Sequence, residues 1–356
     1  MAISPAAGER VAIYIARIYA DAEQEVIRKL ARAIEGGEED IEKWAEGKLA
    51  DLSRVRRDIK NEVIGDLDEH VPPEIEERLE DIYKRGQESA VADLRRVLDE
   101  DDIEVTEGFT RTNRRTVEAL ARDTIEKTEA AHLRIVRSAT DEYRRIVSKT
   151  AEEVATGVST RMEASQSALS KFANRGITGF VDEAGRSWNL QSYCETAIRS
   201  ASGRAAIRGQ IDRTKENGRD LMVVSDHAEE CELCRPWEGR VVSIDGDDPN
   251  YPPLSQAEAD GLFHPNCRHN LGAYIHGLTK TPDPDPDPRG YEERQQQRYI
   301  ERNIRKWKRR EAGAISDKER DKSRNKVREW QARMADFVEA TDRRRKYERE
   351  QIHEAW

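Results

Sequence analysis

The residues best suited to chemistry lie late in the chain, in two short pairs. Cys231 and Cys234 are separated by two residues, His264 and Cys267 by two more, and 29 residues lie between the pairs. Two residues at this spacing present both side chains from one tight turn, and zinc takes four such ligands in a tetrahedron. The pairs therefore predict a structural zinc site of composition Cys₃His.

Two other histidines, His227 and His269, lie beside these pairs. They are possible substitute ligands, or donors that fix the geometry of the ligands. The alternative without metal is three reduced cysteines and hydrogen-bonded histidines in a small packed module. We favour metal because the paired spacing is hard to obtain by chance and because clustered thiols in a reducing compartment indicate metal more than disulfides.

A catalytic interpretation of the same segment is a zinc-stapled nuclease of the His-Asn-His type, or a DNA-binding module. It would use Asp226-His227 before the first cysteine pair and Asn266 and His269 beside the second. In such nucleases the Asp-His pair lies between the cysteine pairs, whereas here it precedes the first. No nucleophile, base and orienting group occur together elsewhere, so we expect no enzymatic activity.

Short strands and one helix must position the Cys/His residues. Strands are predicted at Phe180–Asp182 and Trp188–Leu190, around a Gly turn. A helix follows, with Cys194 as a small buried residue on its apolar face, and Asn217-Gly218 ends it. Strands at 221–224 and 241–244 complete a compact α+β unit.

The region before this unit is predicted to be helical throughout. Apolar residues recur every three or four positions from Val11 to Ile34, until Gly36-Gly37 stops the helix. Val71-Pro72-Pro73 predicts a hairpin between antiparallel helices. The longest periodic segment runs from about Thr112 to Met162, and its apolar stripe is expected to pack on a neighbouring helix of the same chain.

The last part of the chain differs from the rest in charge. Residues 290–356 hold 20 Lys and Arg against 14 Asp and Glu, a net charge of +6, whereas residues 1–289 have a net charge of −16. Basic runs beside aromatic residues predict weak, sequence-independent contact with DNA phosphates. The residues concerned are Arg305, Lys306, Lys308, Arg309, Arg310, Arg343, Arg344 and Arg345.

Composition and patterning together predict a mainly α protein with a small α+β module. Charged residues make up 37% of the chain and aromatic residues 6%, which favours solvated helices. We expect an elongated helical domain at 1–175, the Cys/His module at 176–278, a Pro-Asp linker at 279–290, and a basic tail, helical or partly disordered, at 291–356. The longest early apolar run, 11–16, is too short for a membrane span, so we expect neither membrane insertion nor export.

From about Arg175 to Gly277 the chain resembles the Mu F-like head morphogenesis family of phage minor capsid proteins, of the minor capsid protein 2 type. Single residues of this likeness are Gly185-Arg186, Trp188, Cys231 and Cys234. The longer stretches that carry it are Phe180-Val181-Asp182, Val224-Ser225-Asp226-His227, Pro236-Trp237-Glu238-Gly239 and Gly261-Leu262-Phe263-His264-Pro265-Asn266-Cys267-Arg268-His269. The helical regions on both sides match in general character.

This resemblance implies a structural protein of the virion, located inside the capsid at the portal vertex after assembly in the host cytoplasm. The portal protein, the major capsid or scaffold proteins and packaged double-stranded DNA are its implied partners. The implied role is in head assembly and in DNA packaging and ejection. We further expect the helical region before Gly176 to fasten the chain to the portal, through apolar positions such as Tyr143, Val147 and Val154.

Overall fold

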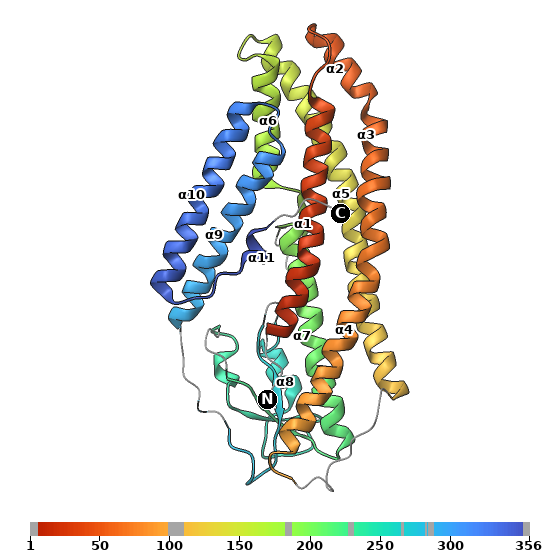
Figure 1. The fold of residues 1–356 in the computed structure, drawn as a ribbon. Helices are drawn as coiled ribbons and strands as arrows, with labels where there is room; N and C mark the ends of the chain where they lie inside the picture. Colours follow the sequence, from red (N-terminus) through yellow and green to blue (C-terminus); the bar gives the residue numbers. More distant parts are fainter. Residues whose placement is uncertain are drawn as a thin grey trace. The chain divides into compact units, whose positions relative to one another are not determined.

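The computed structural model describes residues 6–98, 110–181, 187–226, 231–264, 267–281, 283 and 288–351. These ranges are mainly helical, as predicted, with five short strands (Figure 1). None of the described helices is both long and apolar enough to cross a membrane. The chain forms two compact units of three segments each. Unit 1 is Met1–Ile15, Pro72–Lys127 and Glu195–Gln295, and unit 2 is Ala16–Val71, Thr128–Cys194 and Gln296–Trp356. The division predicted from the sequence, into four domains that follow one another along the chain, stays a prediction.

The first helix, α1 (Ala6–Ile34), follows the apolar period of the sequence. Most of its apolar residues are buried, and Val26 and Leu30 are 0% exposed. The helix ends before Gly36-Gly37. Their φ angles of 70° and 107° are positive, a conformation that glycine adopts easily because it has no Cβ. The next helix, α2 (Ile41–Ala50), begins at Asp40, whose carboxylate accepts a bond from the Lys43 N–H and so caps the helix.

The predicted hairpin at Val71–Pro73 is wrong, because both prolines lie inside a helix. After α3 (Leu52–Asp58) and the π-helical η1 (Ile59–Ile64), α4 continues as Gly65–Leu94. Each proline removes a backbone bond and costs about 3 kcal/mol. A continuous buried face outweighs this cost, since burying each large apolar side chain contributes roughly 1.5–3 kcal/mol. Four residues at intervals of four form this face: Leu67, Val71, Ile75 and Leu79.

The long periodic segment is one helix, α5 (Arg111–Ala155), but it ends earlier than predicted. Gly157 has a φ of 70°, and Thr160 starts α6 (Arg161–Arg175) with a reciprocal capping box to Glu163. Tyr143 and Val147 are 0% and 1% exposed, so this part of the stripe packs within the chain as expected, whereas Val158 and Met162 at its end are 75% and 42% exposed. The expectation that these two residues contact the portal is therefore wrong.

Strands β1 (Thr178–Val181) and β2 (Ser187–Asn189) pair antiparallel, and α7 (Leu190–Glu216) follows, all as predicted. Asp182 and the Gly turn lie outside the described residues. Cys194 of α7 is fully buried, and Gly218 after the helix has a φ of 65°. α7 is therefore the helix that the sequence predicts before the Cys/His residues.

Within unit 1, two glycines bring α4 and α7 into backbone contact. A Cβ on Gly86 would overlap the carbonyl oxygen of Ala206, and a Cβ on Gly209 would overlap that of Tyr83. The Tyr83 hydroxyl also donates to the Asp212 carboxylate at 2.6 Å. The position of α7 along α4 is thereby fixed.

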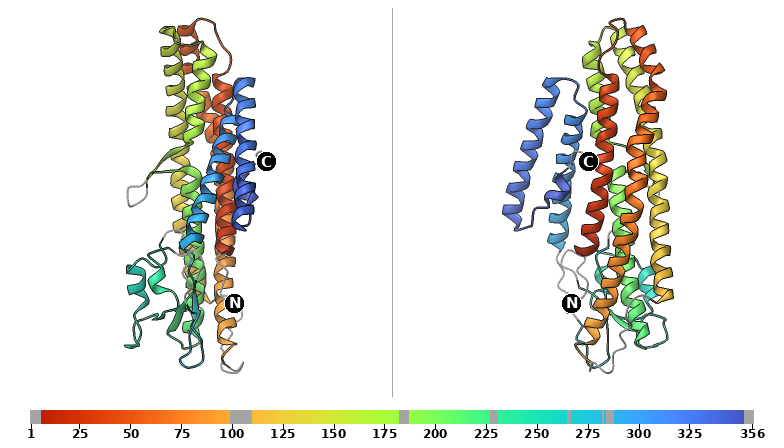
Figure 2. Two further views of the ribbon diagram at one scale, coloured as in Figure 1. Left: turned by 90° about the vertical axis from the view of Figure 1, so that its left-hand side faces the viewer. Right: turned by 45° about the vertical axis from the view of Figure 1, so that its right-hand side comes forward.

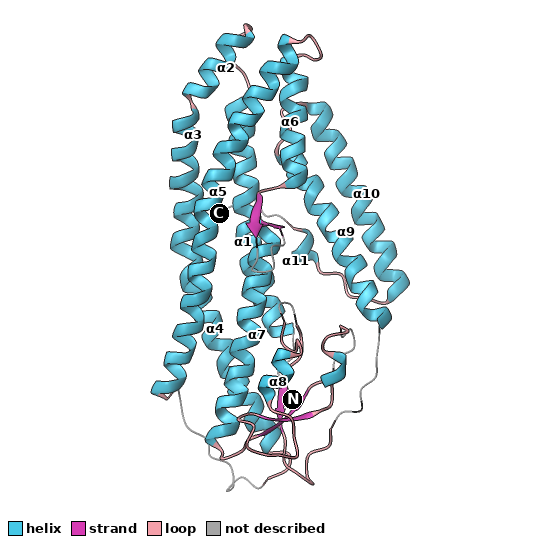
Figure 3. Cartoon of the chain, turned by 180° about the vertical axis from the view of Figure 1, so that it is seen from behind, coloured by secondary structure: helices cyan, strands magenta, loops and turns pink. Residues whose placement is uncertain are grey.

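The sheet that carries the Cys/His residues has the order β4-β3-β5, with both pairs antiparallel. Its strands are β3 (Leu221–Val224), β4 (Val241–Ser243) and β5 (Leu271–Ala273), and Figure 3 shows them close to α8 (Leu254–Ala259). β5 and α8 were not predicted, because three and six residues are too few to show a period. Side chains of α7, the sheet and α8 share one core, made of Ile207, Ile211, Met222, Val224, Val242, Leu254, Ala257, Leu262 and Leu271, together with Cys234 and Trp237.

The tail is helical, as α9 (Pro288–Ala312), α10 (Asp317–Thr341) and the short α11 (Tyr347–Glu350). α9 and α10 lie side by side in Figure 2 and share a core of Ile300, Ile304, Val327 and Met334. Most prolines of the predicted linker at 279–290 lie outside the described residues, and α9 begins at its last proline, Pro288. Proline is well suited to a first helical turn because its N–H would be unpaired there.

Candidate metal centre

The first Cys pair lies on a tight turn that leads into a 3₁₀ helix, η3 (Arg235–Trp237). The N–H groups of Cys234 and Arg235 both donate to the Cys231 carbonyl, at 3.1 and 3.0 Å. Trp237 then donates to the Cys234 carbonyl at 2.9 Å and is itself buried. This turn brings the two thiols to one side, as the two-residue spacing predicted.

The second pair is positioned by the end of α8. The Leu262 N–H donates to the Ala257 carbonyl at 2.9 Å across Gly261, whose φ is 108°, in the manner of a Schellman cap. Phe263 also has a positive φ, 62°, and packs on the module's core. The Cys267 N–H then donates to the His264 carbonyl at 2.8 Å, while residues 265 and 266 lie outside the described ranges.

The fold brings Cys231 to His264 and Cys234 to Cys267, but Cys267 falls outside the group of Cys231, Cys234 and His264 whose ligand atoms all lie within 4.8 Å of one another. Cys231 Sγ lies 3.1 Å from His264 Nε2, and Cys234 Sγ lies 3.6 Å from Cys267 Sγ. Zinc–sulfur bonds of about 2.3 Å in a tetrahedron place two sulfurs about 3.8 Å apart, so the Cys234–Cys267 separation suits two ligands of one ion. The donor set of three thiols and one imidazole also suits zinc.

His269 joins the cluster as a fifth donor. Its Nδ1 lies 3.5 Å from Cys267 Sγ, and its Nε2 lies 2.6 Å from Glu238 Oε1. The potential ligand atoms form two groups that share Cys234, one with Cys231 and His264, the other with Cys267 and His269. A histidine that binds metal through one ring nitrogen commonly donates the other N–H to a carboxylate, and the fully buried Glu238 side chain is in that position.

The hydrogen bond between Cys234 and Cys267 shifts the pKa values of the two thiols in opposite directions. A hydrogen bond from Cys234 is the largest cause that lowers the pKa of Cys267 to about 4, with His269 adding to the effect against burial. The same bond, together with burial, raises the pKa of Cys234. Burial acts to lower the pKa of His269, but its bonds to Cys267 and Glu238 outweigh that and raise it. A thiolate held in this way is the form that binds a cation.

The alternative nuclease site is only partly visible. His227 and Asn266 lie outside the described residues, so their geometry with Asp226 is not defined. The side chain of His269 is 3% exposed and bonded to buried Glu238. The His269 imidazole is therefore shielded from solvent by its own module.

Glu238 is a candidate functional residue that sequence reasoning missed. It falls within the stretch that resembles the family, but no role was predicted for it. The signal that identifies it is burial: a carboxylate with 0% side-chain exposure bonded to a histidine of the cluster. Its position becomes visible only once η3 and the segment after Cys267 are folded together.

Several of the predicted DNA-contacting residues make internal contacts. Arg305 is buried and donates to the Arg349 carbonyl, and Arg309 is buried between the Ala173 carbonyl and Glu23. Arg310 and Arg345 pair with Glu319 and Glu350, and Arg343 donates to Gln297. Lys306 and Lys308 are half-buried, and Arg344 is exposed. DNA contact by this set stays a prediction.

Comparison with known proteins gives one family over most of the chain. A family model described as phage minor capsid protein 2 matches residues 3–339. A structural protein of Lactococcus phage LL-H is 28% identical over 225 residues, 58% of this chain and 61% of that relative, so less than two thirds of the relative's length is matched. A structural protein of Lactococcus phage mv4 is 33% identical over 115 residues, 29% of this chain and 94% of that relative. No solved structure matches at a comparable level.

Proposed function

Because the chain belongs to the phage minor capsid protein 2 family, we propose that it is a non-catalytic component of the phage head, bound to the portal inside the capsid. The family match over nearly the whole chain is the observation that carries this proposal. The two relatives described as structural proteins of Lactococcus phages support a place in the virion. In this role the protein assists head assembly and DNA packaging or ejection, with major capsid or scaffold proteins and DNA as further partners.

The proposed function of the Cys/His module is structural. Cys231, Cys234, His264 and Cys267 would hold one zinc ion, with His269 as a substitute ligand or, through Glu238, as an orienting donor. The ion supplies cross-linking between the turn after β3 and the segment between α8 and β5. This cross-link stabilises a sheet of strands only three or four residues long, which is too small to be stable alone.

Attachment to the portal is proposed for exposed apolar positions of the helical region before Gly176. Leu133 on α5 and Val158 beyond its end are 78% and 75% exposed, unlike the buried Tyr143 and Val147. Exposed apolar side chains can be replaced without loss of core contacts. They therefore test docking separately from folding.

The experiment is co-purification of the full chain with the portal protein of its phage. Leu133→Asp combined with Val158→Asp should reduce the bound amount at least fivefold while the thermal unfolding midpoint stays unchanged. Leu278→Asp is the matched control, because Leu278 is 55% exposed but lies in unit 1, after the Cys/His residues. A loss of binding with Leu278→Asp alone would move the attachment to the module. If the wild-type chain is absent from purified virions by mass spectrometry, the virion role itself is rejected.

A further inference from the structure

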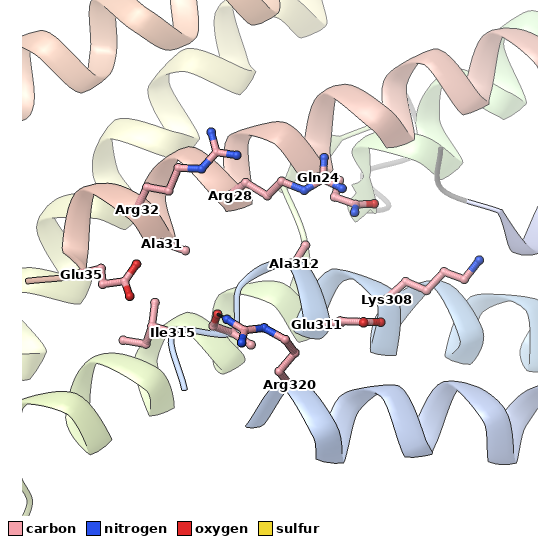
Figure 4. Close-up of a pocket in the computed structure, with 11 residues that line it drawn as sticks. Gln24, Arg28, Ala31, Arg32, Glu35, Lys308, Glu311, Ala312, Ile315 and Arg320 are labelled. Atoms are coloured by element: carbon pink, nitrogen blue, oxygen red, sulfur yellow. Dashed lines mark hydrogen bonds between the residues drawn. The ribbon is translucent and has the colours of Figure 1, made fainter. Parts of the chain in front are cut away.

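Unit 2 contains a pocket of about 500 Å³ that the proposed virion role does not use. Residues of α1, α9, the α9–α10 turn and α10 line it (Figure 4). The volume falls in the range of small-ligand sites. Its apolar lining is confined to small residues such as Ala31 and Ala312 and to Ile315, so polar groups dominate recognition.

The polar lining carries an excess of positive charge. Four cationic residues surround the pocket: Arg28, Arg32, Lys308 and Arg320. Two carboxylates accompany them, Glu35 and Glu311, which leaves an excess of two positive charges.

Charges outside the pocket offset only part of this excess, since Arg320 forms an exposed ion pair with Asp317 at 2.5 Å. Glu311 pairs with Arg324 at 3.1 Å. Arg28 and Arg32 share one carboxylate, Glu25, at 3.4 and 3.6 Å. Arg28 and Glu25 are partly buried, at 21% and 23% side-chain exposure, but one carboxylate shared by two guanidinium groups balances only half of their charge. The two arginines can therefore still bind a further anion.

Two groups in the pocket lack the partners that burial normally requires. The Gln24 side chain is 8% exposed, and its Oε1 accepts no hydrogen bond in the described part of the chain. An amide can present either oxygen or nitrogen by turning over, so this group can serve a ligand as acceptor or donor. Burial lowers the pKa of Lys308 against the opposing effect of Glu350 and Glu311, although neither carboxylate forms an ion pair with its ammonium group.

We infer that this pocket binds a ligand with one or more phosphate groups, held by Arg28, Arg32, Lys308 and Arg320. A terminal phosphate group brings nearly two negative charges at neutral pH, and two neighbouring phosphodiesters of a DNA backbone bring one each, so either source supplies the negative charge that the lining lacks. Its tetrahedral oxygens can accept bonds from several cations at once, and arginine binds them in bidentate fashion. A single carboxylate would bring only one negative charge to these four cations. The phosphates come from a free polyphosphate or from a DNA backbone.

The test is calorimetric titration of the full chain with pyrophosphate at low salt, with two pocket variants. Arg32→Glu changes a side chain that is 69% exposed, so folding should be preserved, and it should weaken pyrophosphate binding at least tenfold. Lys308→Met keeps the aliphatic stem and should weaken it about fivefold. Arg333→Glu is the control: its side chain is 55% exposed on the same unit, about 20 Å along α10 from Arg320, and it should change affinity less than twofold.

A short DNA duplex then distinguishes the two sources. If the duplex displaces pyrophosphate and its own binding falls with Arg32→Glu but not with Arg333→Glu, backbone phosphates occupy the pocket. If pyrophosphate binds and the duplex does not displace it, the ligand is a free polyphosphate. Failure of the wild type to bind pyrophosphate, or equal effects of Arg32→Glu and Arg333→Glu, overturns the inference. None of these outcomes depends on the portal, so the proposed virion role is tested separately.

Discussion

The Cys/His module and the basic α9–α10 tail were both singled out by residue type, but only in the module do those residues converge on one site. Cys231 and His264 meet at 3.1 Å, and Cys234 and Cys267 at 3.6 Å. In the tail, Arg305 and Arg309 are buried against backbone carbonyls of their own unit. Two cysteines separated by two residues lie on one turn, so the sequence alone predicts how their side chains are placed relative to each other. A run of basic residues on a helix does not predict the contacts of its side chains, because their partners come from distant segments.

The largest expected effect is that the Cys/His module, but not the tail, depends on bound metal for its folding. Removing zinc with a chelator, or Cys267→Ser, should unfold residues 220–275, since structural zinc contributes on the order of 10 kcal/mol. Hydrogen exchange of β3 and β5 amides checks this, alongside metal analysis of the freshly purified chain. Cys194→Ala is the control, because that buried thiol belongs to neither group of candidate ligands and should leave zinc content unchanged. Unchanged exchange and no metal in the wild type would exclude the zinc site but not the family.

The tail should respond to the loss of a single buried cation. Arg309→Met removes a bond to the Ala173 carbonyl and the pairing with Glu23, whose side chain is 2% exposed. Leaving that carboxylate buried should lower the free energy of unfolding by about 3–5 kcal/mol. Arg333→Met should change it by less than about 0.5 kcal/mol, as expected of an exposed pair. Urea unfolding measures both, and equal effects would mean that Arg309 is no more structural than a surface arginine.

A smaller effect is expected from Glu238→Gln within the module. The amide cannot offer His269 the same charged acceptor, so the histidine loses its orienting partner. Zinc affinity should fall about 10- to 100-fold, as is usual when a carboxylate behind a metal-site histidine is removed. Competition with a chromophoric chelator measures it. Glu232→Gln, at the exposed position between the cysteines, is the matched control, and a similar loss there would point to general electrostatics.

The smallest effect concerns the start of α10. The Ser316 hydroxyl accepts the Glu319 N–H at 3.3 Å, and Ser316→Ala should destabilise the chain by about 1 kcal/mol. Ser316→Asp retains an acceptor and should restore most of that stability. Thermal unfolding of the full chain compares the two. If both variants behave alike, the tail helix does not depend on its cap.

The sequence predicts the features that depend on neighbouring residues, such as helices and paired ligands. It misses the features that depend on packing between distant segments. The apolar period from Val11 to Ile34 predicts α1, and paired spacing predicts the four ligands. The hairpin at Pro72-Pro73 fails because burial of Val71 and Ile75 outweighs the two lost backbone bonds. The role of Glu238 cannot be predicted, because its contact with His269 joins residues 31 positions apart.

The interleaving of the two units constrains how the chain can fold during synthesis. Unit 1 needs residues up to Gln295 before its last segment is present, and unit 2 needs residues from Gln296 onward. At about 5–20 residues per second, the first segment of unit 1 waits roughly 15–60 s for the last one to be made. Unit 1 can therefore be completed before unit 2, although α1 contributes residues to both. Until the ribosome has synthesised α9, part of the apolar face of α1 between Ala16 and Ile34 lacks the residues that cover it in the folded unit. During this interval a chaperone or an early assembly partner has access to that face.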